Sequence, residues 1–162
     1  MCTSQIPTKQ RALVWENVGD KPFEFSTNAP VKQPNELKNN QALVQVFASG
    51  LNPLDSKLGS SNWAHVELPG VPGIDISGKI VAVANDVTDF KIGDEIFGSN
   101  TVKLCGAFQE YAVINTDYFI KKPQGVTHEQ GAALGLSYLC AFDGLHHVQD
   151  KLKAGATIFV PG

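Results

Sequence analysis

The amino-acid sequence predicts a mainly β fold: a small, partly closed barrel with short helices, followed by two helices and one further strand. Two observations predict it. From Lys9 to about Lys122, short runs with the character of strands are separated by Gly, Pro, Asn and Asp, and glycine near strand ends suits strands that bend round a barrel. Beyond the Pro-Gln-Gly sequence at 123–125, the apolar residues recur with the spacing of a helix.

The expected strands are short and follow one another closely. The first two form a hairpin, because an Asn-Val-Gly-Asp turn signal at 17–20 separates them. The third, at 42–49, alternates along its length as a strand in a largely buried sheet does. In chain order the expected strands are 11–15, 23–26, 42–49, 75–83, 95–97, 108–114 and 118–121.

A short helix is predicted directly after the third strand. Asn52 is a suitable N-cap, and Pro53 suits the first helical position because its missing N–H has no helical partner there. Asp55 lies in the first turn, where the helix dipole favours a negative charge.

Two more helices are expected near the end of the chain. Thr127 and Gln130 have the spacing of a capping box, so a short helix should begin after Thr127. Another helix should begin near Ser137 and continue to about Val148. The uncharged, β-branched run at 156–160 is typical of a strand covered on both faces.

Composition excludes several classes of protein. Hydrophobic residues make up 43% of the 162 residues and charged residues 18%, which argues against disorder as the dominant state. The net charge of −3 and the lack of a Lys/Arg cluster argue against nucleic acid or an anionic membrane as a partner. The longest uncharged run, 39–54, is too short to span a bilayer, and the first ten residues do not resemble a signal peptide. We therefore expect a cytoplasmic protein.

No motif for nucleophilic or phosphoryl-transfer chemistry is present. The sequence contains no G-x-S-x-G elbow, no P-loop and no H-E-x-x-H. Cys2, Cys105 and Cys140 are widely spaced and form no C-x-x-C pair, which predicts three reduced thiols and no cysteine metal site.

Three segments in a characteristic order carry a family resemblance. They are SGLNPLDSK at 49–57, LPGVPGIDISGKIV at 68–81 and FKIGDEIFG at 90–98. Each alone is ordinary turn chemistry, but their order and spacing resemble the medium-chain dehydrogenase/reductase superfamily, in its zinc-independent quinone and enone oxidoreductase branch. The resemblance implies a GroES-like domain over 1–126. It also implies that 127–162 holds linker helices and the first strand of a truncated Rossmann nucleotide-binding domain.

The resemblance also implies that metal takes no part. Zinc alcohol dehydrogenases of this superfamily have Cys, His and Cys at the positions matched here by Asn52, Ile74 and Leu136. None of these three residues is a suitable zinc ligand. The stretch where the structural-zinc insertion would lie, 98–108, contains only Cys105.

The activity that the resemblance implies is hydride transfer from NADPH to a quinone or to an α,β-unsaturated carbonyl compound. It also implies a small-molecule substrate and a homodimer of the full-length protein. A Rossmann domain needs several βαβ units, and only a first strand is expected here. We therefore expect this chain to be an N-terminal fragment that is inactive alone. The alternative is a non-catalytic GroES-like module for binding or oligomerisation.

The resemblance places candidate site residues by position. Asn52, Lys57, Cys140 and Gly162 are the candidate cofactor-binding residues, and Lys57 and Tyr138 the candidate catalytic ones. Asn52 is either a plain N-cap or a partner of the nicotinamide half. Lys57 either anchors the ribose, a phosphate or the substrate oxygen, or is simply exposed. Cys140 replaces a family Thr and is alternatively a buried structural thiol, and Tyr138 is a proton donor, a stacking wall or a core aromatic.

The remaining polar residues are given structural interpretations. Asp75 follows the position of the lost zinc-binding His, and we read it as structural or as a hydrogen-bonding anchor under the cleft. His65, His146 and His147 have no acidic or Cys partner at ligand spacing, so we read them as surface or linker residues. His128 lies in the first turn of its expected helix, where the helix dipole disfavours a positive charge, and no function is assigned to it either.

Overall fold

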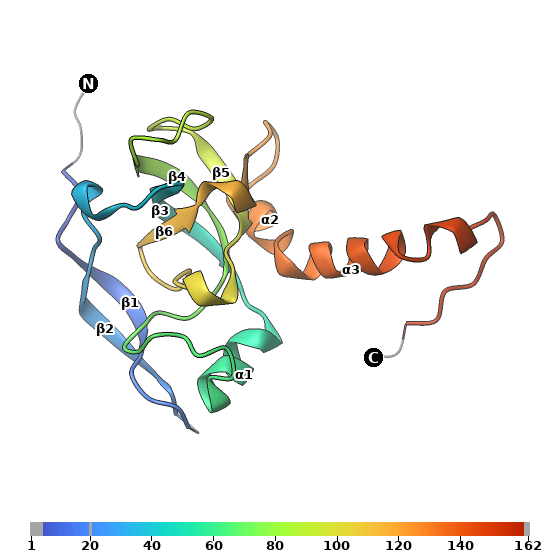
Figure 1. Ribbon diagram of the computed structural model, residues 1–162, viewed down its shortest axis with the longest axis horizontal. Helices are drawn as coiled ribbons and strands as arrows, with labels where there is room; N and C mark the ends of the chain where they lie inside the picture. The colour runs from blue at the N-terminus through green and yellow to red at the C-terminus, as the bar shows by residue number, and fades with distance from the viewer. Residues whose placement is uncertain (1–4, 20, 161–162) are drawn as a thin grey trace.

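The strands form two antiparallel sheets in one body, from which helix α3 projects (Figure 1). The computed structural model describes residues 5–19 and 21–160. The larger sheet has the strand order β6-β3-β4-β5-β7, and β1 and β2 form the smaller one. The strands are β1 Lys9–Trp15, β2 Phe23–Pro30, β3 Gln41–Gly50, β4 Asp75–Val83, β5 Glu95–Ser99, β6 Tyr111–Asn115 and β7 Phe119–Lys121.

Strand β3 lies inside the larger sheet and pairs with β4 on one side and β6 on the other. The buried side chains of this sheet are mostly small or branched, as the alternation in the sequence predicts. The main buried cluster consists of Ala42, Val44, Ile76, Ile80, Ile96, Ala107, Ala112, Ile114 and Phe119. A second cluster surrounds Trp15 and Leu58, and it attaches helix α1 (Pro53–Ser61) to the smaller sheet.

Strand β1 joins the two sheets. Leu13 N–H donates to Phe108 O over 2.9 Å, and Trp15 N–H donates to Gly70 O over 2.8 Å. These bonds bring β1 alongside loops of the larger sheet, but within the described residues β6 and β7 are both edge strands of that sheet and no barrel closes. The predicted mainly β fold is confirmed, and among the described residues the two sheets do not form a closed barrel.

Most predicted strands are present with small shifts. Strand β4 has the predicted bounds, whereas β6 begins at Tyr111 instead of 108. The difference arises because residues just before β6 bond to β1: Phe108 O accepts from Leu13, and Glu110 N–H donates to Arg11 O over 3.3 Å.

The helices begin where the capping signals predict. Helix α1 follows Asn52, and α2 (His128–Ala133) follows Thr127, whose Oγ1 accepts from Gln130 N–H over 3.2 Å while Gln130 Oε1 accepts from Thr127 N–H over 3.0 Å. Helix α3 covers Leu136–His146. Short 3₁₀ turns are η1 Pro34–Glu36, η2 Val102–Leu104, η3 Thr116–Tyr118 and η4 Gln149–Lys151.

The end of the described chain differs most from expectation. Residues 156–160 form no strand, and Phe159 and Val160 are 86% and 79% exposed. A strand needs a hydrogen-bonded neighbour, and no described residue pairs with this run, so the predicted strand is wrong for this structure. The α3 residues after Leu136 are exposed too, including Tyr138 and Cys140, so neither of these two is the buried residue considered above.

No helix among residues 5–19 and 21–160 has both the length and the apolar character needed to cross a membrane.

Candidate functional site

A buried carboxylate joins three segments that are distant in the sequence. Asp75, the first residue of β4, is 2% exposed. Its Oδ2 accepts from Asn52 Nδ2 over 2.8 Å, and its Oδ1 accepts from the Leu136 backbone N–H over 2.9 Å. The residue just before α1, the start of β4 and the start of α3 therefore meet at one side chain.

Two glycines allow this close approach. A Cβ at Gly50 would lie 3.0 Å from Asp75 Oδ2 and 2.8 Å from Ala132 O. A Cβ at Gly135 would lie 2.9 Å from Asp75 Oδ2 and closer still to Oδ1 and Cγ. Only glycine fits at positions where another group comes this near to the backbone.

Asn52 bonds in three directions from its place before α1. Its amide nitrogen donates to Asp75, and its amide oxygen accepts from Ser137 Oγ over 3.4 Å. Its backbone N–H donates to Asp55 Oδ2 over 2.8 Å, which completes the first turn of α1. The candidate site is thus Asn52, Asp75 and Ser137, at the facing N-terminal ends of α1 and α3.

Asp55 lies buried beside this site. It is 5% exposed, and its Oδ1 has no hydrogen-bond partner among the described residues. Burial raises the pKa of the Asp55 carboxyl, and the nearby charge of Asp75 adds to the increase, while the bond from Asn52 N–H opposes it. Ionisation of Asp55 is disfavoured because its low-polarity surroundings solvate the negative charge poorly.

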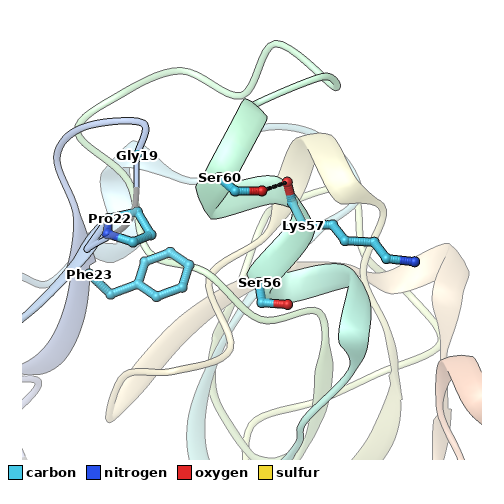
Figure 2. A pocket seen from close by; sticks show the side chains of 6 residues that line it. All are labelled: Gly19, Pro22, Phe23, Ser56, Lys57 and Ser60. Atoms are coloured by element: carbon cyan, nitrogen blue, oxygen red, sulfur yellow. Dashed lines mark hydrogen bonds between the residues drawn. The ribbon is translucent and has the colours of Figure 1, made fainter.

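Lys57 lies on a surface of α1 other than the one at the site of Asn52, Asp75 and Ser137. It lines a hollow of about 490 Å³ with Ser56 and Ser60, opposite Pro22 and Phe23 of the β1–β2 hairpin. Figure 2 shows the Lys57 side chain pointing away from Pro22 and Phe23, while Ser60 Oγ donates to the Lys57 carbonyl over 3.1 Å. Among the described residues, Lys57 has no acidic partner within ion-pair distance.

Tyr138 lines a separate, largely apolar hollow of about 400 Å³. Phe97 and Ile120 from β5 and β7 form one wall, and Leu134 and Leu139 form the other. The structure therefore places the two candidate catalytic residues, Lys57 and Tyr138, in different hollows.

Of the two remaining candidate cofactor residues, Cys140 and Gly162, the structure describes only Cys140. Cys140 is exposed on α3, and no hydrogen bond links it to Asn52 or Ser137 among the described residues. Gly162 lies outside the described residues.

The three positions matched to zinc ligands gather around Asp75. Asn52 and the Leu136 backbone bond directly to its carboxylate, and Ile74 precedes it in the chain, buried at 2% exposure. None of the three side chains offers a sulfur or imidazole ligand. Within the described ranges no three His, Cys, Asp or Glu side chains are placed to hold a metal ion.

Sequence reasoning missed the role of Ser137 and the surroundings of His128. His128 Nδ1 lies 2.8 Å from Ser77 Oγ, and its Nε2 lies 3.7 Å from Glu95 Oε1. These are the residue types of a Ser-His-acid triad, but Ser77 is fully buried and its hydroxyl donates to Ile96 O over 3.1 Å. A substrate has no access to this serine, so the contact attaches α2 to the sheet. No signal in the sequence pairs residues this distant.

Comparison with known proteins places the chain in a family. Residues 38–124 match the family described as "Alcohol dehydrogenase GroES-like domain". The chain is 34% identical over 146 residues to the quinone oxidoreductase of Pongo abelii, covering 86% of this chain and 44% of that protein. It is 31% identical over 166 residues to the chloroplastic NADPH-dependent alkenal/one oxidoreductase of Arabidopsis thaliana, covering 97% of this chain and 42% of that protein.

Solved structures agree. The quinone oxidoreductase from Coxiella burnetii has a TM-score of 0.77 at 27% identity, over 86% of this chain and 45% of that one. That from Pseudomonas syringae has a TM-score of 0.76 at 27% identity, over 86% of this chain and 41% of that one.

The chain spans less than half the length of these relatives, 44% and 42% for the two curated proteins. The family match itself covers more than half of this chain, from residue 38 to residue 124. With the three ordered motifs and the shared fold, this match shows that the chain belongs to the family of alcohol dehydrogenase GroES-like domains.

Proposed function

We propose that this chain is the GroES-like part of an NADPH-dependent oxidoreductase that reduces quinones or α,β-unsaturated carbonyl compounds without zinc. The observation that carries the proposal is the Asp75 site: the positions matched to zinc ligands converge there, and hydrogen-bonding or apolar groups occupy them. The quinone and alkenal/one oxidoreductases among the relatives support the same reaction class. In this proposal residues 1–126 form the GroES-like domain, and 127–162 lead into a nucleotide-binding domain.

The groups at the site fit the nicotinamide end of such a cofactor. Asn52 Oδ1 and Ser137 Oγ lie 3.4 Å apart, and together they offer an acceptor and a hydroxyl donor at the start of an exposed helix. A primary carboxamide has the complementary donor and acceptor. When bound, NADPH would supply the hydride. Lys57, a cation of α1 with an extended side chain, would assist by attracting a phosphate of the cofactor.

The hollow beside Tyr138 suits a flat, apolar acceptor. Phe97, Ile120, Leu134 and Leu139 line it with Tyr138, and the Tyr138 ring is stacked near Phe142 with ring centroids 6.1 Å apart. In the proposal these side chains exclude water and hold the acceptor by apolar contact, while the Tyr138 hydroxyl is available as a hydrogen-bond donor. Hydride transfer requires that the two flat partners lie face to face, and such a dry site can hold them in this alignment.

The decisive experiment follows NADPH absorbance with a panel of quinones and enones. The longest protein product that contains residues 1–162 is compared with the 162-residue chain alone. We expect turnover by the longer protein only, because this chain spans less than half the length of its relatives. Absence of turnover with every acceptor would contradict the proposal and favour a non-catalytic module. Turnover by the chain alone would contradict the expected need for a second domain.

A further inference from the structure

We propose that Asp75 is a positioning residue that fixes the orientation of the Asn52 side-chain amide, with its NH₂ group toward Asp75. In this orientation Asn52 Oδ1 and Ser137 Oγ together select a primary carboxamide. The identification of this carboxamide as nicotinamide rests on the proposed function, whereas the fixed orientation of the Asn52 amide does not. Asp75 would touch neither cofactor nor substrate, and it would act through Asn52 and through the start of α3.

The polarity follows from hydrogen-bonding chemistry. A carboxylate only accepts hydrogen bonds, and both oxygens of Asp75 have donors: Leu136 N–H at 2.9 Å and Asn52 Nδ2 at 2.8 Å. The Asn52 amide must therefore turn its NH₂ group toward Asp75. Its oxygen is left facing Ser137, and the site presents an acceptor there rather than a donor.

Asp75 itself has little freedom to rotate away. Its backbone pairs with Gly50 in the β3–β4 ladder, and its carbonyl accepts from Ser49 Oγ over 2.7 Å. Around the carboxylate, Gly50 and Gly135 come so near that neither position has room for a side chain. The carboxylate is held in one orientation, and this orientation determines that of Asn52.

The same carboxylate also places Ser137. Leu136, the first residue of α3, donates its backbone N–H to Asp75, and Ser137 is the next residue. The Ser137 residue is exposed and its hydroxyl is 3.4 Å from Asn52 Oδ1, a long bond that a ligand carbonyl can replace. One buried group thus sets both halves of the carboxamide-binding pair. Cys140, whose thiol is a weak hydrogen-bonding group, is not needed for this recognition.

Asp75→Asn tests the inference because it should reverse the Asn52 amide. The oxygen of the introduced amide would still have to accept from Leu136 N–H. The NH₂ group of the introduced amide would then face Asn52, and Asn52 Oδ1 would have to turn toward position 75 to accept from it. The matched control is Asp86→Asn, which changes an exposed carboxylate that accepts from Asn40 N–H over 3.0 Å, away from the site.

Two measurements on the 162-residue chain test the orientation of the Asn52 amide and its effect on binding. In ¹⁵N spectra, the Asn52 side-chain NH₂ protons should exchange with water about tenfold more slowly than those of exposed Asn35. Asp75→Asn should remove this protection and Asp86→Asn should not. In titrations, nicotinamide should bind about tenfold better than 3-acetylpyridine, which lacks the N–H donors, and Asp75→Asn should abolish or reverse this preference.

If Asp75→Asn does not fold, Ser137→Ala provides the test, because Ser137 is exposed and its substitution should leave the fold intact. It should weaken nicotinamide binding and leave the Asn52 NH₂ protection intact, and Ser137→Thr should restore binding. Asn52 protons that exchange as fast as those of Asn35, or that are unaffected by Asp75→Asn, would overturn the positioning role. Protected protons without binding of either probe would overturn the carboxamide assignment and would leave the fixed orientation of the Asn52 amide standing; the proposed function is tested separately by NADPH turnover of the longer protein.

Discussion

Gly135→Ala is the substitution whose cost follows most directly from the structure. An added Cβ would lie 2.9 Å from Asp75 Oδ2 and closer to Oδ1 and Cγ, so the carboxylate or the start of α3 has to move. Overpacking of this kind costs about 1–3 kcal/mol. If the displaced carboxylate also loses its bond from Leu136 N–H, the loss adds about 1.5–3 kcal/mol. We expect the free energy of unfolding to fall by about 1–3 kcal/mol if that bond is kept and by about 2.5–6 kcal/mol if it is lost.

Gly144→Ala is the matched control on the same helix. A Cβ at Gly144 meets nothing within 4 Å, and alanine is favoured over glycine inside a helix by about 0.5–1 kcal/mol. Urea unfolding followed by circular dichroism measures both variants. Gly144→Ala should be as stable as the parent chain or slightly more so. A change of less than about 0.5 kcal/mol for Gly135→Ala, within the range of an ordinary surface substitution, would refute the argument from close approach.

Three further predictions concern other parts of the molecule. Because burial raises the pKa of Asp55 in the folded chain, the folded state holds the proton more tightly than the unfolded state. The resulting stabilisation is present below about pH 4 and is lost as the pH rises through the folded-state pKa. The stability difference between Asp55→Asn and the parent chain should therefore grow in favour of the variant as the pH rises from about 3 to about 7, and urea unfolding at several pH values would contradict this if the difference stayed constant. Burial raises the pKa of the Cys105 thiol to about 11, whereas Cys140 is exposed. In a Cys2→Ser background, iodoacetamide should therefore modify Cys140 first, and mass spectrometry that finds Cys105 labelled at the same rate would be inconsistent with the described burial. Thr127→Ala removes the acceptor for Gln130 N–H and should lower the free energy of unfolding by about 1 kcal/mol, with Thr127→Ser as the conservative control that retains the parent value.

Much of the local structure could be predicted because its signals lie within a few residues of one another. The bounds of β4 were predictable from its alternating, branched residues, and the start of α2 from the Thr127–Gln130 capping box. The order of the three motifs indicated the family before any contact was known, and the match over residues 38–124 confirms it. Local patterns of this kind depend on side-chain periodicity and capping, which act over one or two turns of chain.

The candidate site could be predicted only in part. Asn52 and Asp75 were recognised separately, but the bond between them joins residues 23 apart, and the bond from Ser137 to Asn52 joins residues 85 apart. Lys57 and Tyr138, grouped by resemblance, line different hollows. Nothing in the sequence near any of these residues reports which distant segment will lie against it.

By itself, then, the sequence determined most of the strands, the helix starts and the family of this protein. The tertiary structure alone decided that the lost zinc-ligand positions gather round one carboxylate, and that Gly50 and Gly135 make room for it. It also decided that the strand-like run 156–160 stays unpaired among the described residues. The physical reason is the same in each case: a capping box or an alternating strand is complete within its own segment, whereas a buried hydrogen bond or a sheet pairing exists only when a second segment supplies the partner.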